Sequence, residues 1–323
     1  MSDARPPSIS DMQITRGWLL RVVGSVVILA GLLWYLPTEK LWSGLSSVGP
    51  TLFLIVLGLF IAGHAVSAFK WLTLLGFGFP YVTALRAHFA GLAANLYLPG
   101  VAGGDVVRAA LVSSHKPLAE LTAGSLGDRL VDMLALALLA ALGVLMLQDS
   151  SQSALAIQVV LGFVVAVLGA FYVGPAIAAK LLALVPSLPA RGLIEKMATA
   201  FRTLGRRPLA LLSALVLSLA IQGGFIWLTI WLAQAVGIDA PIGAWFFAWP
   251  LAKIIAVLPI SLGGIGVREA SLSALMVPFG ADAASVVATS LIWQAVLICA
   301  GILGVFAWVM SSARRGRVVE CRE

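Results

Sequence analysis

Residues 98–110 read LPGVAGGDVVRAA, and residues 258–270 read LPISLGGIGVREA. The two stretches lie 160 residues apart, and seven of their thirteen positions are identical. Two unrelated apolar stretches would share about one or two positions, so the match indicates that the chain is built from two repeated halves. In each stretch a proline and a pair of glycines interrupt an apolar segment, which predicts a break between two short helices.

The composition on either side of these breaks is that of a membrane protein. The 323 residues are 61% hydrophobic and 11% charged, and their mean hydropathy is +1.03. A soluble domain carries about 25% charged residues. These values exclude a soluble globular protein, a disordered chain and a nucleic-acid-binding module. The net charge of +7 is interpreted as a topology signal. Cys299 and Cys321 form neither a disulfide framework nor a metal-binding spacing.

Six apolar runs of about 20 residues are long enough to cross a bilayer as helices. They are residues 18–36, 50–69, 121–147, 154–174, 209–236 and 284–310. The first run ends without a small-residue cleavage site, so we expect a retained helix and not a signal peptide. The two interrupted segments, residues 84–117 and 243–279, each contain two arms that are too short for two full crossings. We therefore predict a re-entrant helical hairpin in each segment.

The distribution of basic residues predicts the orientation of these segments. Lys and Arg are absent from the loops at 148–153, 237–242 and 280–283, and Lys40 is alone in the 37–49 loop, whereas sixteen basic residues lie in or near the remaining connections and the two tails. The positive-inside rule makes the bare loops external and both termini cytoplasmic. The hairpin at 84–117 then enters from the cytoplasm and the one at 243–279 from outside. The predicted fold is an all-α polytopic membrane protein with six full spans and two hairpins in an inverted two-fold repeat; eight simple spans are the alternative.

This topology divides the chain into two repeats and two tails. The N-terminal tail is 1–17, the first repeat 18–147, the second repeat 148–310 and the C-terminal tail 311–323. Within the second repeat, residues 175–208 carry six basic residues among apolar ones. This pattern favours a cytoplasmic amphipathic stretch that lies on anionic lipid headgroups, although an ordinary connector between the halves has the same composition.

Eight charged side chains remain at membrane depth after the loops are assigned. They are Arg108, Arg129, Lys253, Arg268, Asp105, Asp128, Asp132 and Glu269. An unpaired charge at the bilayer centre costs about 2.5 to 3.5 kcal/mol or more, so these groups are expected to pair with one another or to line a wet cavity. Sequence spacing suggests local pairing of Asp105 with Arg108, of Arg268 with Glu269, and within the Asp128–Asp132 helix face. Purely structural salt bridges would satisfy the same pattern.

Arg108 and Arg268 each follow a glycine pair near the start of a short helix. Free N–H groups and the helix dipole favour an anion at such a position, and guanidinium groups bind phosphate or carboxylate. The candidate substrate-binding residues are Asn95, Gly103, Gly104, Arg108, Lys253, Gly263, Gly264 and Arg268. Lys253 would either contact a phosphate or pair with an acid. The glycines alone are also explained by close helix packing.

The three histidines and the acidic residues show no metal-ligand spacing. His64 is interpreted as a packed or interfacial side chain. His88 and His115 flank the first hairpin and are interpreted as solvated near the cytoplasmic surface. We therefore expect neither a metal nor a cofactor.

Three segments, residues 95–108, 128–132 and 258–270, resemble the marks of the lysylphosphatidylglycerol synthase transmembrane-region family, also described as the flippase-like domain family. The resemblance covers nearly the whole chain. It implies a bacterial or archaeal inner-membrane protein that moves a lipid, such as an aminoacylated phospholipid or a polyprenyl-linked or hopanoid-type lipid. Larger members carry an aminoacyl-transferase domain after the membrane part, and we do not expect that activity in this chain.

The favoured hypothesis is a flippase that moves an anionic or phosphate-bearing lipid by alternating access of the two halves. Its partners would be membrane lipids with anionic headgroups, and no nucleic acid. The chain lacks the phosphate-binding loop of nucleotide hydrolases, which argues against direct use of ATP. One alternative is a membrane enzyme that binds a divalent metal through Asp105, Asp128 and Asp132. Another is a non-transporting subunit that supports a lipid-synthesis enzyme.

Overall fold

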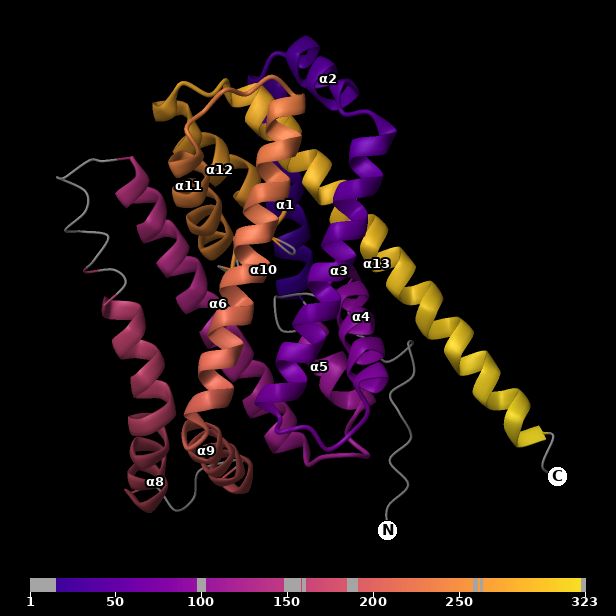
Figure 1. Cartoon of the computed structure of the whole chain (residues 1–323), viewed down its shortest axis with the longest axis vertical. Helices are drawn as coiled ribbons and strands as arrows, with labels where there is room; N and C mark the ends of the chain where they lie inside the picture. Colours follow the sequence, from indigo (N-terminus) through magenta and orange to yellow (C-terminus); the bar gives the residue numbers. More distant parts are fainter. Residues whose placement is uncertain are drawn as a thin grey trace.

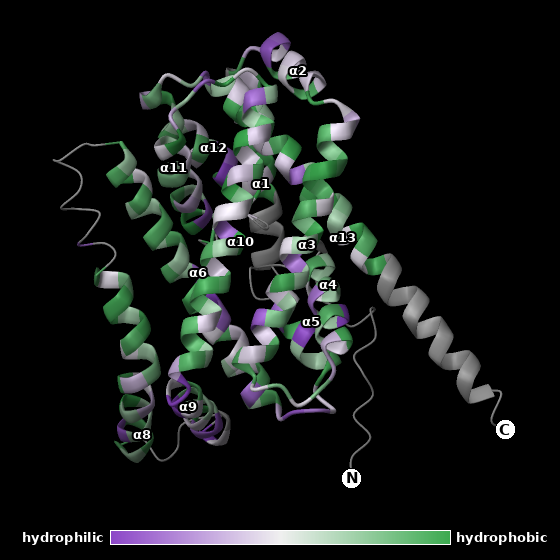
Figure 2. Cartoon of the chain, viewed as in Figure 1, coloured by the Kyte–Doolittle hydropathy of each residue, from purple (hydrophilic) through white to green (hydrophobic). Residues whose placement is uncertain are grey.

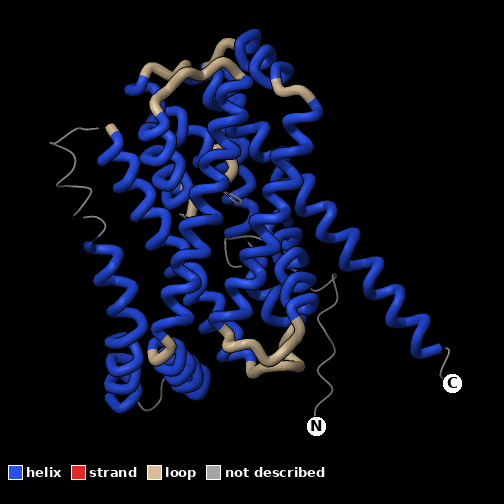
Figure 3. Tube along the Cα trace, viewed as in Figure 1, coloured by secondary structure: helices blue, strands red, loops and turns tan. Residues whose placement is uncertain are grey.

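The computed structural model describes residues 16–97, 103–147, 158, 161–184, 191–257, 261 and 264–320. Within these residues all regular secondary structure is helical, and most of the loops gather at two opposite ends of the molecule (Figure 3). The all-α fold class is therefore confirmed.

Five helices are long and apolar enough to cross a membrane. They are α3 (Pro50–Leu74), α6 (Leu118–Met146), the helix at Leu161–Leu184, α10 (Pro208–Ala235) and the Ala283–Val305 part of α13 (Ala283–Glu320). These helices correspond to five of the six predicted runs. The remaining run forms α1 (Arg16–Tyr35), whose described apolar part, Val23–Trp34, is shorter, so its crossing stays a prediction.

The fourth predicted run ends in the wrong place. The sequence predicts its end at residue 174, but the helix continues as α8 (Gly174–Leu184). A π turn, η2 (Gly169–Val173), precedes Pro175, and the Gly174 N–H bonds to the Gly169 carbonyl five residues earlier. This change of register lets the helix continue past a proline that cannot donate a hydrogen bond. The amphipathic stretch predicted at 175–208 is consequently reduced to α9 (Arg191–Gly205).

Each interrupted segment forms a pair of short helices. The first pair is α4 (Tyr81–Tyr97) with α5 (Gly103–Leu111), and the second is α11 (Ile242–Ile255) with α12 (Val267–Met276), which continues into the 3-10 turn η3 (Val277–Phe279). The two pairs occupy opposite halves of the molecule (Figure 1). Most residues of the two breaks, Gly263 among them, lie outside the described part of the chain.

The two halves of the chain pack against each other reciprocally. Helix α6 of the first half packs on α11 of the second, and α13 of the second half packs on α4 of the first. The central helices α3 and α10 pack together. At the α6–α11 crossing, a Cβ on Gly143 would meet the backbone of Phe246 and Phe247, and at the α4–α13 crossing a Cβ on Gly304 would meet the Phe89 backbone. Small residues at these points allow the backbones to approach closely.

The centre of the bundle contains an aromatic core. Phe60 of α3 stacks on Phe225 of α10 at a centroid distance of 5.0 Å, and Trp293 of α13 contacts both rings edge-on. Trp249 of α11 packs edge-on against Trp293 at 5.1 Å. These rings come from both halves of the chain, so the core fixes the halves around one central space.

Hydrophilic residues lie at both ends of the molecule, around α9 and the loops beside α4 and α5 at one end and on α2 (Thr38–Ser47) at the other (Figure 2). The loops at 75–80 and 112–117 lie at the end with α9, and those at 236–241 and 280–282 lie at the opposite end with α2 (Figure 1). The side chains of Arg207 and Lys116 reach Gly76 and Gly78 at the end with α9. Basic residues from connections that are distant in sequence thus lie at the same end of the bundle.

Candidate functional site

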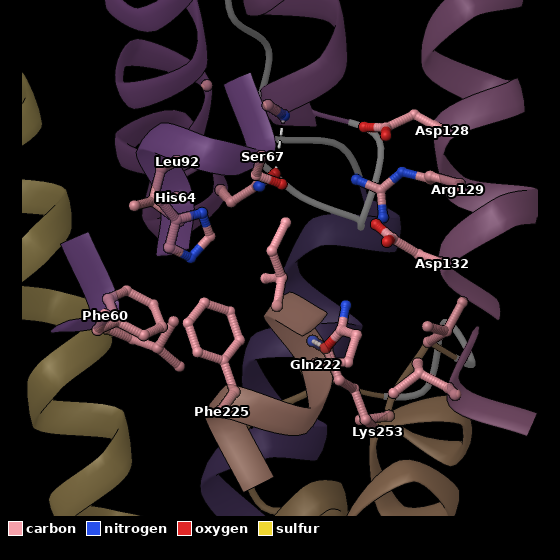
Figure 4. A pocket seen from close by; sticks show the side chains of 18 of the residues that line it. Phe60, His64, Ser67, Leu92, Asp128, Arg129, Asp132, Gln222, Phe225 and Lys253 are labelled. Atoms are coloured by element: carbon pink, nitrogen blue, oxygen red, sulfur yellow. Dashed lines mark hydrogen bonds between the residues drawn. The ribbon is translucent and has the colours of Figure 1, made fainter. Parts of the chain in front are cut away.

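A cavity of about 340 Å³ lies between the two pairs of short helices. Side chains from α3, α4, α5, α6, α10, α11, α12 and α13 line it. Asp128, Arg129 and Asp132 project along one wall, and His64 and Phe225 face them from the other side (Figure 4). The cavity is therefore charged on one side and aromatic on the other.

Most of the residues selected from the sequence meet at this cavity. Those that line it are Asn95, Gly104, Asp105, Arg108, Asp128, Arg129, Asp132, Lys253 and Arg268. Gly103, Gly264 and Glu269 are described but do not line it. Arg108 and Arg268, which occupy matching positions 160 residues apart, thus reach a common space from opposite ends of the molecule.

Arg108 is held by groups from its own helix and from α6. Its guanidinium lies 2.9 Å from the Asp105 carboxylate, as predicted, and 3.4 Å from the Asp128 carboxylate. It also donates to the Ser125 hydroxyl at 3.2 Å and stacks over the Trp71 ring at 4.3 Å. Only 4% of the residue is exposed. These contacts fix the planar group at the cavity wall.

Arg268 is held by a different set of partners at the start of α12. It donates to the Glu269 carboxylate at 2.7 Å, as predicted, and to the Gln294 side-chain oxygen at 2.9 Å. Glu269 is fully buried and also accepts the Gly266 N–H at 2.6 Å. Gly266 has a positive φ of 84°, a conformation that favours glycine. Glu269 therefore anchors both the arginine and the helix start.

Asn95 and Gly104 join the two helices of the first pair. The Gly104 N–H donates to the Asn95 side-chain oxygen at 2.8 Å, so this N–H is not free for an anion. A Cβ on Gly104 would collide with the Gly91 carbonyl and the Asn95 amide. The packing interpretation of this glycine is thus supported, and Asn95 acts here as a brace between α4 and α5.

The acidic residues of α6 pair across helices. Arg129 bonds to the Asp105 carboxylate on α5. Lys70 of α3, whose side chain is fully buried, lies 3.0 Å from Asp128 and 2.6 Å from Asp132. The Ser218 hydroxyl donates to Asp132 and accepts from Lys70. The acidic residues therefore have partners on other helices in addition to the local pairing that the sequence spacing suggests.

One comparison with known proteins identifies the family. The sequence model of the lysylphosphatidylglycerol synthase transmembrane region matches residues 21–304. The chain belongs to this family. No curated protein matches the chain. The match spans both pairs of short helices and every described residue that lines the cavity, so the cavity lies within the family's membrane region.

In this family member Lys253 has a neutral hydrogen-bond partner. Its ammonium donates to the Gln222 side-chain oxygen at 2.8 Å and lies 5.9 Å from the centre of the Phe225 ring. Among the described residues no carboxylate lies within ion-pairing distance of it. Lys253 therefore makes no direct ion pair with an acid of the described residues, and both interpretations of it, as a phosphate contact and as the partner of an acid, stay predictions.

Several residues of the site are not predicted by the sequence. Lys70 was assigned to the cytoplasmic connection, although the apolar sequence continues through residues 71–75 and could have revealed its depth. His88 was interpreted as solvated, but it lies 3.0 Å from His64 and lines the cavity, because α4 buries it against α3. His64 packs against Phe60, in agreement with its prediction, and His115 is exposed. Gln222 and Gln294 gave no sequence signal.

Proposed function

We propose that this protein is a lipid transporter that moves an anionic or phosphate-bearing lipid across the cytoplasmic membrane by alternating access. The headgroup would enter the central cavity while the acyl chains stay in the bilayer. The observation that carries the proposal is the meeting of Arg108 and Arg268 at one cavity, each from a different half of the chain. Binding sites of many transporters lie at such a repeat interface near the bilayer midplane.

The reciprocal packing of the helices supports an inverted two-fold repeat. Exchanging the first half for the second converts the α4–α13 contact into the α11–α6 contact and leaves the α3–α10 contact in place. The matched stretches at 98–110 and 258–270 give the same correspondence from the sequence. Rocking of two such halves around a fixed site would expose the headgroup alternately to the two sides.

Helix length supports the proposal that both short pairs are re-entrant. With a rise of 1.5 Å per residue, the nine residues of α5 and the ten of α12 span about 14 and 15 Å. The hydrocarbon core is about 30 Å thick, so neither helix crosses it. The location of the pairs in opposite halves of the molecule agrees with entry from opposite sides (Figure 1).

The basic end of the molecule supports the proposed orientation. Lys116, Arg207 and α9 share the end that carries the connections into and out of the first short pair. By the positive-inside rule this end would face the cytoplasm, and α9 would lie on anionic headgroups. Figure 2 shows that the sides between the two ends are mainly hydrophobic, as lipid contact requires.

The ion pairs of the cavity favour transport over metal chemistry. A membrane enzyme acting on a lipid phosphate would need carboxylates available to a divalent metal. Asp105, Asp128 and Asp132 each contact a lysine or an arginine. Metal-dependent turnover of a lipid phosphate by the purified protein would instead support the enzyme hypothesis.

Reconstitution tests the transport proposal. Vesicles with the purified protein and a trace of fluorescent phosphatidylglycerol would be treated with a membrane-impermeant quencher, which reports the lipid that reaches the outer leaflet. We expect rapid movement by the wild type and strong loss in Arg108→Gln and Arg268→Gln. Arg86→Gln changes an exposed arginine of α4 and should move lipid normally. If both cavity variants move lipid at the wild-type rate, the arginine site is wrong.

A further inference from the structure

Four carboxylates and five cations line the central cavity or, in the case of Lys70 and Glu269, contact a charged residue that lines it. The carboxylates are Asp105, Asp128, Asp132 and Glu269, and the cations are Lys70, Arg108, Arg129, Lys253 and Arg268. Each carboxylate lies within ion-pairing distance of at least one of these cations. With all of these groups in their ordinary charge states, the described part of the cavity carries one uncompensated positive charge.

The two histidines at the cavity, His64 and His88, add no charge to this count. An arginine can only donate hydrogen bonds, so the His88 Nδ1, which lies 3.4 Å from the Arg108 guanidinium, must accept. The His88 Nε2 then carries the proton and donates to the His64 Nδ1 at 3.0 Å. Both imidazoles are neutral in this arrangement.

The uncompensated charge belongs to Lys253. The four other cations each contact a carboxylate, whereas Lys253 donates to the amide oxygen of Gln222. An ammonium has three donors, and the described residues accept one of them. A charge without a counter-ion is expensive in a membrane interior, and such a residue marks a ligand or ion pathway by default. Lys253 and Gln222 face the cavity together (Figure 4).

We propose that Lys253 sets the charge of the substrate, and that the cavity binds a lipid headgroup with a single negative charge, as in a phosphodiester. This inference rests on the transport function proposed above. A phosphate monoester carries about −1.5 to −2 at pH 7 and would overcompensate the site. A zwitterionic headgroup would bring its own ammonium among five cations. The volume of about 340 Å³ lies at the low end for ligand pockets, which suits a small headgroup.

Two variants abolish the uncompensated positive charge in different ways. Lys253→Gln deletes it, and Gln222→Glu keeps the lysine but gives it a carboxylate at the position of the present amide oxygen. The second variant retains every cation and adds an ion pair, so it controls for loss of folding in the first. Gln234→Glu makes the same substitution on an exposed position of α10, three turns farther along the helix, and serves as the matched control.

The measured quantity is the ratio of transport rates for phosphatidylglycerol and phosphatidylcholine, both labelled on an acyl chain, in vesicles of unlabelled phosphatidylcholine. We expect the wild type and Gln234→Glu to prefer phosphatidylglycerol. Both cavity variants should lower that ratio by about tenfold or more, as expected for a close charge pair. If either cavity variant keeps the wild-type ratio, or if the wild type moves both lipids equally, the inference is wrong. Failure of the wild type to move any lipid would instead contradict the transport function itself.

Discussion

The ammonium of Lys70 in α3 lies 2.6 Å from the carboxylate of Asp132 in α6. The same nitrogen lies 3.0 Å from Asp128, and the Lys70 side chain is fully buried. A single cation thus pairs with two carboxylates of one helix face, one of which also contacts Arg108. This relationship links a central helix of the first half to the wall of the cavity.

We predict that Lys70→Met strongly destabilises the protein. The substitution leaves Asp128 and Asp132 next to each other without their shared cation, and breaking a buried ion pair costs about 3–5 kcal/mol. The effect is measured by thermal unfolding in detergent, in which the fraction of folded protein is determined after heating. Lys40→Met removes an exposed pair with Asp282, which is worth about 0–1 kcal/mol, and should shift the midpoint much less. Equal shifts in the two variants would contradict the role of Lys70.

The helical elements could be predicted from the sequence because each rule that applies to them is local. A run such as 209–236 is apolar over its whole length, and the proline–glycine breaks mark the ends of the short helices. The end of the 154–174 run was misplaced because Pro175 is a terminator in an ordinary helix. Here the π turn at Gly169–Val173 precedes it, and no composition rule reports such a turn.

Only those features of the site that depend on charged residues and their spacing in the sequence could be predicted. The matched position of Arg108 and Arg268 indicated a shared role, and both line the cavity. Contacts between helices carry no sequence signal in a single chain, so the pairing of Lys70 with Asp132, 62 residues apart, was missed. For the same reason the neutral partner of Lys253, Gln222, was not foreseen.

Gly104→Ala should destabilise the first short pair. The new methyl group would meet the Gly91 carbonyl and the Asn95 amide, and a backbone neighbour cannot turn away as a side chain can. Overpacking of this kind costs about 1–3 kcal/mol. Gly58→Ala in α3 has open space around its Cβ and should be neutral or slightly stabilising, since alanine favours helix. Thermal unfolding of both variants checks the contrast, and a Gly104→Ala protein as stable as wild type would refute the close approach.

Glu269→Gln should destabilise the second pair of short helices and remove the main anchor of Arg268. The Glu269 carboxylate accepts from Arg268, from the Gly266 N–H and from the Ser290 hydroxyl at 3.1 Å. A neutral amide leaves the buried Arg268, of which 9% is exposed, without its counter-ion, and breaking such a pair costs about 3–5 kcal/mol. Gln294→Ala removes a neutral partner of the same arginine and should cost less. Thermal unfolding compares the two variants, and we expect the lower midpoint for Glu269→Gln. A lower midpoint for Gln294→Ala would show that the carboxylate is not the anchor.

The stability of the start of α13 should decrease in acid because Asp282 becomes protonated. Partial burial alone would raise the pKa of this carboxyl, but hydrogen bonds from Ser285 and the contact with Lys40 outweigh it and lower the pKa below its ordinary value. A lowered folded-state pKa contributes stability above the unfolded value of about 3.9, and this contribution is lost as the pH falls through the folded pKa. Asp282→Ala should therefore cost about 1 kcal/mol at pH 7, typical of a lost N-cap, and progressively less below pH 4.

Asp282→Asn separates the stability that Asp282 contributes through its charge from the stability that it contributes as an N-cap. Asparagine is as good an N-cap as aspartate, so this variant should keep most of the stability at pH 7 and lose only the share due to charge. Unfolding midpoints measured from pH 7 to pH 3 would show the wild-type curve approaching the Asp282→Asn curve at the acid end, because other titrating groups are common to both proteins. Parallel curves over the whole range would mean that the Asp282 charge does not stabilise the start of α13.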